Sequence, residues 1–442
     1  MPLLVLLLLI LFPLPATALE KVTFDKALQS AVNQRPAAQI ARQQAAAAAA
    51  AVGEAHSGYL PRLSLQEQFV STNEPGGSLF ISLNQERMQL SPTADPYNDP
   101  PRRRDFETKL VLQQPLYNPD ITYQTKQAKA GAAAAKATAR WNEEEVAYTL
   151  FRAYLQVQQM KAQHQWVESS LAEAEEIARL SSTQREAGTG LKADELRAQV
   201  LLSEAQRRQL TAENDLKLAR RQLALAMGRD IEEIDIAAPL TIAAFSPAPP
   251  TESSRQDLVA LQQKLKAADF AQQQSRAAYL PRLGVAAWYS LHDRSLPFAA
   301  DGQSWTAAAT LEWEIFDGLR RRHTRQRTQA EQESARLQLE EAKRQSRLAL
   351  AEAELRTEEM RLRLASAETS LQQAKESYAL LQQRYAAGLS PMADLLGACD
   401  ALTRARFERV RAESGLIAAL GGIQFQNGTF LQTFMNDKES SR

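Results

Sequence analysis

Tyr-Leu-Pro-Arg-Leu occurs at residues 59–63 and again, unchanged, at residues 279–283. Each copy follows an alanine- and glutamine-rich stretch typical of a helix and precedes an extended stretch. Further along, Ala187-Gly188 matches Ala387-Gly388 at an offset of 200 residues. The same offset pairs many later residues, among them Asp194 with Asp394, Leu202 with Leu402, and Leu216 with Leu416. Because the matched positions keep one order, the chain is an internal duplication.

Each half contains stretches with the two-residue period of a β-strand. In the second half, an apolar set that includes Trp305 and Leu311 alternates with a polar set that includes Thr306 and Glu312. Aromatic residues near strand ends are typical of a membrane barrel, but soluble hairpins have a similar pattern, so both interpretations stay open here. We expect strands near residues 60–72, 105–117, 280–292 and 304–316.

Long helices follow both strand pairs. Residues 319–387, about 69 in number, contain no proline or glycine, which corresponds to about 100 Å of helix. Apolar residues near the end of this stretch recur at spacings of three and four, and many of them are alanine. This pattern predicts coiled-coil hairpins over residues 119–227 and 319–420, in which small side chains let the helices approach closely.

An apolar run near the N-terminus, followed by the small residues Ala16 and Ala18, predicts a signal peptide. The basic residues that usually begin a signal peptide are missing, since none precedes Lys21. No cysteine directly follows the apolar run, so we do not expect a lipid-anchored form. The expected domain layout is a signal peptide, a first repeat, a proline-rich segment, a second repeat and a polar C-terminal tail: residues 1–18, 19–227, 228–255, 256–422 and 423–442.

Composition argues against several classes of function. The 52 basic and 52 acidic side chains leave no net positive field for nucleic acid. Cys399 is the only cysteine, so no intrachain disulfide forms, and we expect it to be a small residue facing neighbouring helices. The four histidines are scattered, and no nucleophile with a base or phosphate-binding loop occurs at a useful spacing. We expect no metal, no cofactor and no enzyme activity.

Four strands per chain cannot close a membrane barrel, because the smallest such barrels have about eight. An open sheet in lipid would leave the backbone groups of its edges unpaired. If these strands span a membrane, several chains share one barrel, and physical reasoning allows a dimer or a trimer.

Several motifs resemble those of the TolC-type outer-membrane efflux proteins. The two pentapeptides resemble the motif that opens a strand in that family. Residues 114–119 and 314–318 resemble its strand-to-helix junctions, and residues 385–388, followed by Asp394, resemble its tip turn and return helix. The resemblance covers about residues 21–422.

This resemblance implies a mainly helical fold with a transmembrane β-barrel portion: a homotrimer with a twelve-stranded barrel in the outer membrane and a helical tunnel in the periplasm. The proline-rich segment would then form an equatorial belt. The protein would be a passive, gated duct of an efflux or type I secretion system. Its partners would be outer-membrane lipid, a periplasmic adaptor and an inner-membrane pump of the RND or ABC type. The alternative is a periplasmic coiled-coil adaptor or scaffold without a channel.

The resemblance also suggests pore residues at the periplasmic tip. Asp394 falls where the family often has a pore-lining carboxylate, although an aspartate at a helix start is also favoured by the helix dipole. Tyr385 is either a hydrogen-bonding gate residue or the last residue of the coiled-coil seam. Gly397 stands where some relatives have a second aspartate, and Ser390 stands where an arginine would form an interhelical salt bridge.

Both glycines of the duplicated turn are expected to end a long helix, because glycine readily adopts the left-handed backbone conformation of such ends. In the family this turn also meets the adaptor. The expected adaptor contacts are Gly188, Thr189, Leu191, Gly388, Leu389 and Ser390. Of two arginine clusters, residues 102–104 would lie near the outer loop, where lipid phosphates are available, and residues 320–322 would lie on the periplasmic side of the barrel. The alternative for both clusters is plain solvated charge.

Overall fold

The computed structural model describes residues 19–88, 98–245 and 255–435. The expected signal peptide lies outside these residues. The chain divides into two compact units, and each takes residues from both sequence repeats. One unit comprises Met1–Ala41, Ala139–Gln256 and Arg344–Arg442, and the other comprises Arg42–Thr138 and Asp257–Lys343.

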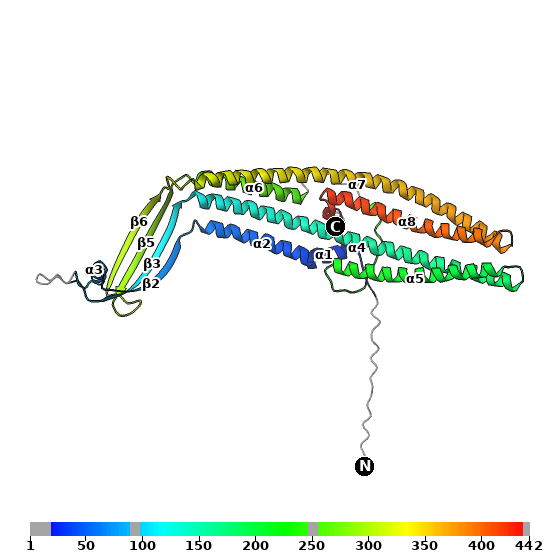
Figure 1. The fold of residues 1–442 in the computed structure, drawn as a ribbon, viewed down its shortest axis with the longest axis horizontal. Coiled ribbons are helices and arrows are strands. Elements are labelled where there is room, and N and C mark those ends of the chain that lie inside the picture. Colours follow the sequence, from blue (N-terminus) through cyan, green and yellow to red (C-terminus); the bar gives the residue numbers. More distant parts are fainter. Residues whose placement is uncertain (1–18, 89–97, 246–254, 436–442) are drawn as a thin grey trace, which may run out of the picture. The chain divides into compact units, whose positions relative to one another are not determined.

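The second unit contains a four-stranded antiparallel sheet in the order β2-β3-β5-β6 (Figure 1). The register places Leu65 opposite Leu110, Val111 opposite Trp288, and Tyr289 opposite Trp305. Among the residues that the structure describes, strands β2 and β6 each have a neighbour on one side only, so both edges of the sheet are open there. The strands span Arg62–Thr72 (β2), Arg103–Tyr117 (β3), Arg282–Asp293 (β5) and Gly302–Glu312 (β6).

The two faces of this sheet differ in chemistry, because successive side chains on a strand point to opposite sides. One face, here called the apolar face, carries exposed aliphatic and aromatic side chains. It includes Leu63, Leu65, Phe69, Leu110, Leu112, Val285, Tyr289, Trp305 and Leu311. The other, the polar face, includes Gln66, Gln68, Glu107, Lys109, Ser290, His292, Ser304 and Thr306. Glu67 lies on the apolar face, where it accepts a hydrogen bond from the Thr108 hydroxyl on the neighbouring strand.

Strand β6 is shorter than the sequence predicts. We expected it to reach residue 316, but it ends at Glu312. Beyond it, the carboxylate of Asp317 accepts the backbone N–H and the side-chain Nε–H of Arg321, each at 2.9 Å, and Gly318 has a φ of +66°. This local capping turns the chain into helix α7 (Arg320–Ala386), so Ile315 and Phe316 remain outside the strand.

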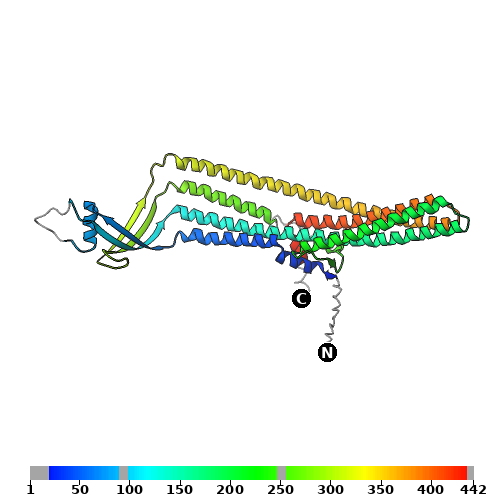
Figure 2. The same ribbon diagram turned by 60° about the horizontal axis from the view of Figure 1, so that its bottom comes forward.

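Helices enter and leave the sheet at the same end. Helix α2 (Pro36–Ser57) ends just before the first pentapeptide, whose Tyr59 hydroxyl shares a hydrogen bond with the Thr122 hydroxyl. Helix α6 (Gln256–Ala277) ends before the second pentapeptide. At the other end of the sheet lies α3 (Pro75–Asn84), a helix that the sequence analysis did not predict (Figure 2).

Two long helical hairpins follow the strands. In the first, α4 (Pro119–Glu186) is followed by α5 (Lys192–Ala226). In the second, α7 is followed by α8 (Met392–Gln426). The ends of α4 and α7, the starts of α5 and α8, and the ends of α5 and α8 are each 200 residues apart. In the second hairpin, Leu371 and Tyr378 of α7 lie in one buried cluster with Leu395, Ala398 and Leu402 of α8.

The core of the first unit is aromatic. Phe24, in α1 (Phe24–Gln34), packs edge-on against Phe151 and Tyr154 of α4, with ring centroids 6.3 and 5.4 Å apart. The segment after α5 is tied to this core by β4 (Ile234–Ile236), which pairs in parallel with β1 (Glu20–Val22). Asp235 of β4 forms ion pairs with Lys161 at 3.0 Å and Arg220 at 3.2 Å. A short 3₁₀ helix, η1 (Ile242–Ala244), follows, and residues 246–254 of the proline-rich segment lie outside the described residues.

Most of residues 423–435, the first part of the expected polar C-terminal tail, are helical. Helix α8 continues to Gln426, and a further helix, α9, covers Phe430–Met435. Phe430 is fully buried and lies 5.2 Å from Phe151 between ring centroids, and Phe425 stacks on Tyr148 at 4.5 Å. These aromatic contacts hold the segment in the core, because burying such rings is strongly favourable.

Among the described residues, no helix is both long enough and apolar enough to cross a bilayer.

Candidate functional site

The two hairpin turns have the same backbone hydrogen bonds. Gly188 and Gly388 have φ values of +76° and +73°. In the first turn, the N–H groups of Gly188 and Thr189 donate to the carbonyls of Arg185 and Gln184 at 3.0 and 2.9 Å. In the second turn, the N–H groups of Gly388 and Leu389 donate to Tyr385 and Arg384 at 2.9 and 2.8 Å. This is the Schellman arrangement, which satisfies the last carbonyls of a helix and requires a left-handed residue.

Both turns lie at the same end of the first unit (Figure 1). Leu191 and Leu389 are 69% and 70% exposed, so each turn presents a large aliphatic side chain to solvent. Thr189 is also exposed, and Ser390 is half-buried. A Cβ atom added at either glycine would meet nothing within 4 Å. The expected adaptor contacts therefore form an accessible surface whose shape depends on the two glycines.

Equivalent positions in the two turns have opposite chemistry. In the first hairpin, Glu195 forms ion pairs with Arg185 across the turn and with Lys192, at 2.7 and 2.5 Å. Hydrogen bonding to Lys192, and then to Arg185, lowers the pKa of Glu195 against the opposing effect of desolvation. In the second hairpin, the residues 200 positions later are Tyr385, Met392 and Leu395, which are 5%, 1% and 0% exposed. Ion pairs therefore stabilise the turn of the first hairpin, whereas buried apolar side chains stabilise the turn of the second.

Tyr385 lies within the seam. Its side chain belongs to the buried cluster of the second hairpin. Its backbone carbonyl accepts a hydrogen bond from Gln184 Nε2 at 3.2 Å, which joins the two hairpins. Burial, and then the charge of Asp194, raises the pKa of the Tyr385 hydroxyl.

The two repeated aspartates have different surroundings. Asp394, in the first turn of α8, is exposed and accepts a hydrogen bond from the Ser390 hydroxyl at 3.4 Å. Asp194, in the first turn of α5, is half-buried and forms an ion pair with Arg197 at 3.3 Å. The carboxylate of Asp394 is therefore the more available of the two to an ion or a neighbouring chain.

A comparison with known protein families identifies the family. A family model described as "Outer membrane efflux protein" matches residues 27–229 and 251–424, which is more than half of the chain. The chain belongs to the outer membrane efflux protein family. The resemblance stated from the sequence motifs is thereby confirmed, and the outer membrane is the protein's location.

Two curated relatives of this efflux protein come from Pseudomonas aeruginosa. The pyoverdine export outer membrane protein OpmQ is 28% identical over 287 residues, which cover 61% of this chain and 60% of OpmQ. The alkaline protease secretion protein AprF is 26% identical over 195 residues, which cover 41% of this chain and 40% of AprF. The chain thus matches less than two thirds of the length of either relative.

Solved structures of outer-membrane channels share the fold. VceC from Vibrio cholerae has a TM-score of 0.77 at 16% identity, with 92% of this chain and 96% of VceC covered. The CmeC channel from Campylobacter jejuni has a TM-score of 0.80 at 15% identity, with 95% of this chain and 89% of CmeC covered. The predicted fold class, mainly helical with long coiled-coil hairpins, is confirmed, and the four predicted strands form one sheet.

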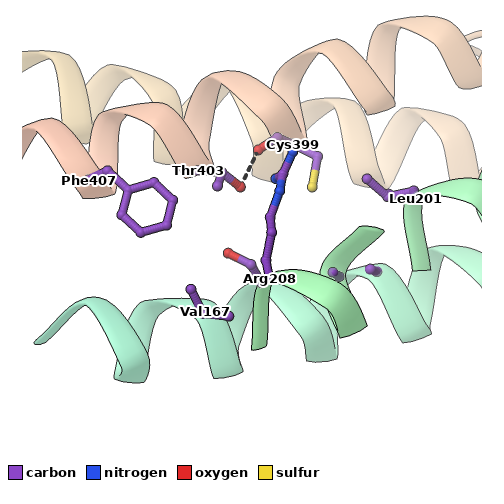
Figure 3. A pocket seen from close by; sticks show the side chains of 9 residues that line it. Val167, Leu201, Arg208, Cys399, Thr403 and Phe407 are labelled. Atoms are coloured by element: carbon purple, nitrogen blue, oxygen red, sulfur yellow. Dashed lines mark hydrogen bonds between the residues drawn. The ribbon is translucent and has the colours of Figure 1, made fainter. Parts of the chain in front are cut away.

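In this efflux protein Cys399 is a packing residue. It is buried beside a small pocket between α4, α5 and α8, whose lining includes Val167, Leu201 and Arg208 (Figure 3). Burial, followed by the charge of Glu173, raises the pKa of the thiol to about 11. A thiol with such a pKa stays protonated near neutral pH and is a poor nucleophile.

One ionic contact between the two hairpins is not evident from the sequence pattern. Arg406 of α8 donates to both carboxylate oxygens of Glu173 of α4, at 2.9 and 2.7 Å. Its guanidinium also lies over the Trp166 ring, 5.0 Å from the centroid. The sequence feature that could have indicated this contact is an arginine in a seam made otherwise of small and apolar residues, because a buried arginine needs a partner.

Proposed function

We propose that this chain forms a homotrimeric outer-membrane channel, which conducts substrates that a periplasmic adaptor and an inner-membrane pump deliver. The chain acts as a passive duct and catalyses no reaction itself. The relatives are named for pyoverdine export and for alkaline protease secretion. Export from the cell is therefore the activity that we propose.

The four-stranded sheet is the main observation that supports the proposal. Its apolar face exposes large side chains, of which Trp305 is 77% exposed, and its other face carries mainly polar side chains. This division suits a barrel wall with lipid outside and water inside. The open edges of β2 and β6 would be costly in lipid, but β6 of one copy can pair with β2 of the next. Two copies would give eight strands and three would give twelve, and the family's typical trimer favours twelve.

Exposed leucines on the hairpins support assembly from several copies. Leu348, Leu355 and Leu362 on α7 are 62%, 74% and 66% exposed. Their spacing of seven residues places them along one side of the helix. Leu210, Leu218 and Leu225 form a similar exposed row on α5. Within one chain these rows are uncovered, and neighbouring helices of a tunnel would bury them.

We assign the gate and the adaptor surface to the tip of the hairpins. Three copies of the exposed Asp394 would form an acidic ring that favours cations. Tyr385 would support the start of the helix that carries Asp394, because it lies in one buried cluster with Met392 and Leu395. The adaptor would contact the two turns through Thr189, Leu191, Leu389 and Ser390, on a backbone shaped by Gly188 and Gly388.

Membrane fractionation and paired substitutions test the proposal. The mature protein should fractionate with outer membranes and migrate as a detergent-stable trimer. Leu65→Lys, on the apolar face, should reduce membrane assembly, because a lysine facing lipid near the bilayer centre costs about 2–4 kcal/mol. Gln66→Lys is the matched control on the polar face of the same strand and should assemble normally. A soluble periplasmic monomer, or equal behaviour of the two variants, would contradict the channel and favour an adaptor or scaffold.

A further inference from the structure

Helix α3 connects β2 to β3 at the end of the sheet far from the hairpins' strand junctions (Figures 1 and 2). Ser78, Ile81 and Gln85 are 2%, 7% and 4% exposed, and their spacing of three and four places them on one side of the helical segment. Phe80 and Leu83 are 65% and 45% exposed. The helix therefore has a side packed on the protein and a separate apolar side in solvent.

A buried polar chain anchors the end of α3 to the sheet. Gln85 Nε2 donates to Asp105 Oδ1 at 2.9 Å and to the carbonyl of Arg104 at 2.8 Å. Asp105 Oδ2 in turn contacts His292 Nδ1 at 2.8 Å. Asp105 and His292 are 5% and 6% exposed. Because Asp105 and His292 belong to the polar face, this chain places α3 on that face.

Gly302 gives a second, independent indication of the same placement. It lies opposite His292 in the register, so a Cβ atom at this position would point toward the polar face. Such an atom would lie 1.9 Å from the carbonyl oxygen of Asn84, the last residue of α3. The backbone of α3 thus occupies the space directly above Gly302, which only glycine permits.

The loop between β5 and β6 lies over the opposite face. The backbone N–H of Phe298 in this loop donates to the Thr108 hydroxyl at 3.2 Å, and Thr108 belongs to the apolar face. The side chain of Phe298 is 63% exposed, almost the same as that of Phe80. The two connections at this end of the sheet therefore cover different faces and present equally exposed phenylalanines.

We propose that α3 narrows the lumen at the outer mouth of the channel, and that Phe80 and Leu83 determine what passes there. The inference rests on the proposed function: if the sheet closes into a barrel with its polar face inward, α3 lies inside the barrel. The strand ends that carry α3 are opposite those joined to the periplasmic helices, so this end faces the cell exterior. Copies of Phe80 from each chain then form an apolar ring, which hinders water and ions by dewetting.

Cysteine labelling in planar bilayers tests the position of α3. Phe80→Cys and Phe298→Cys are compared with the wild type, whose single Cys399 is buried and should not react. Each channel is treated from the outer side with a bulky, membrane-impermeant maleimide, and the modification is verified by mass. Labelled Phe80→Cys should lose about half or more of its single-channel conductance, because the added group lies within a narrow pore. Labelled Phe298→Cys and treated wild type should conduct as before.

The control channels separate this inference from the proposed function. If the untreated wild type forms no trimer and no pore, the channel proposal fails. If the wild type conducts while labelled Phe80→Cys conducts normally, or resists labelling, α3 does not line the lumen. An equal loss from the labels at residues 80 and 298 would also overturn the inference, because the two residues would not then lie on different sides of the barrel wall.

Discussion

The carboxylate of Glu144 accepts the backbone N–H of Leu431 at 3.0 Å, which joins α4 to the start of α9. Glu144 is 6% exposed, and its burial raises the pKa of the carboxyl group to about 7. The hydrogen bond from Leu431 acts in the opposite direction, and the charge of Glu143 raises the pKa further. The carboxyl group of Glu144 thus joins the C-terminal helix to α4, and its burial there disfavours the ionised form.

Replacing Glu144 by Gln should remove a pH dependence of stability. The folded pKa of about 7 lies above the ordinary value of 4.5, so the folded protein binds this proton more tightly. The contribution of this proton to the free energy of unfolding is complete below about pH 4.5. It is lost as the pH rises through about 7, and the free energy of unfolding then falls by at most about 3 kcal/mol. Thermal unfolding measured between these pH values should show no such loss of stability for Glu144→Gln. The matched variant Glu145→Gln, at an exposed position, should lose stability with rising pH as the wild type does.

The two turns should respond differently to salt. The turn of the first hairpin is closed by ion pairs of Glu195 with Arg185 and Lys192, whose partner side chains are about half exposed. Such pairs weaken when salt screens them, whereas the apolar closure at Tyr385, Met392 and Leu395 does not depend on charge. Hydrogen exchange in about 1 M salt should speed up around residues 185–195 and not around residues 385–395, since the Debye length falls to about 3 Å. Parallel changes at both turns would contradict this difference.

Gly388→Val should weaken adaptor binding and export more than trimer assembly. The residue has a φ of +73°, and valine in this conformation costs about 1–2 kcal/mol or more. The space around its Cβ is open, so the cost arises from the backbone of the turn alone. Gly397→Ala is the control, because its surroundings are equally open and its place inside α8 favours alanine. Pull-down with the adaptor measures adaptor binding, and gel migration measures trimer assembly. An equal loss of adaptor binding and trimer assembly would show that the glycine serves folding only.

Asp394→Asn should reduce cation selectivity and block by divalent cations, while Asp194→Asn should leave both unchanged. The reason is that Asp394 is exposed, whereas Asp194 is paired with Arg197. A ring of like carboxylates favours cations, and the amide removes its charge with little change in size. Single-channel currents of both variants under a salt gradient give the comparison. If Asp394→Asn behaves like the wild type, the aspartate is a helix-start charge rather than a pore residue.

The ends of the helices and the division of the strands could be predicted from sequence because local rules control them. Gly188 and Gly388 end their helices through hydrogen bonds within six residues of chain. The alternation around Trp305 and Leu311 identifies the apolar face before any strand partner is known. The duplication then relates one half to the other, including the 200-residue offset between helix ends.

Local sequence by itself could not place α3 or α9. Pro75, Gly76 and Gly77 suggest a loop, and α3 is held by Asp105 and His292 from distant strands. The C-terminal segment looks polar in its composition, yet Phe434 packs on Phe430 and on Phe24, near the other end of the chain. In both cases contacts far apart in sequence outweigh weak local propensity.

By itself the sequence determined the duplicated plan, the long hairpins, the two-faced strands and the family, because periodicity and turn chemistry are properties of neighbouring residues. Only the tertiary structure decided which polar groups are buried and what they hold. Glu144 on Leu431, Arg406 on Glu173 and Gln85 on Asp105 each join segments that pattern analysis treats separately. A buried polar group needs a specific partner at hydrogen-bond distance, and the chain reveals that partner only when it is folded.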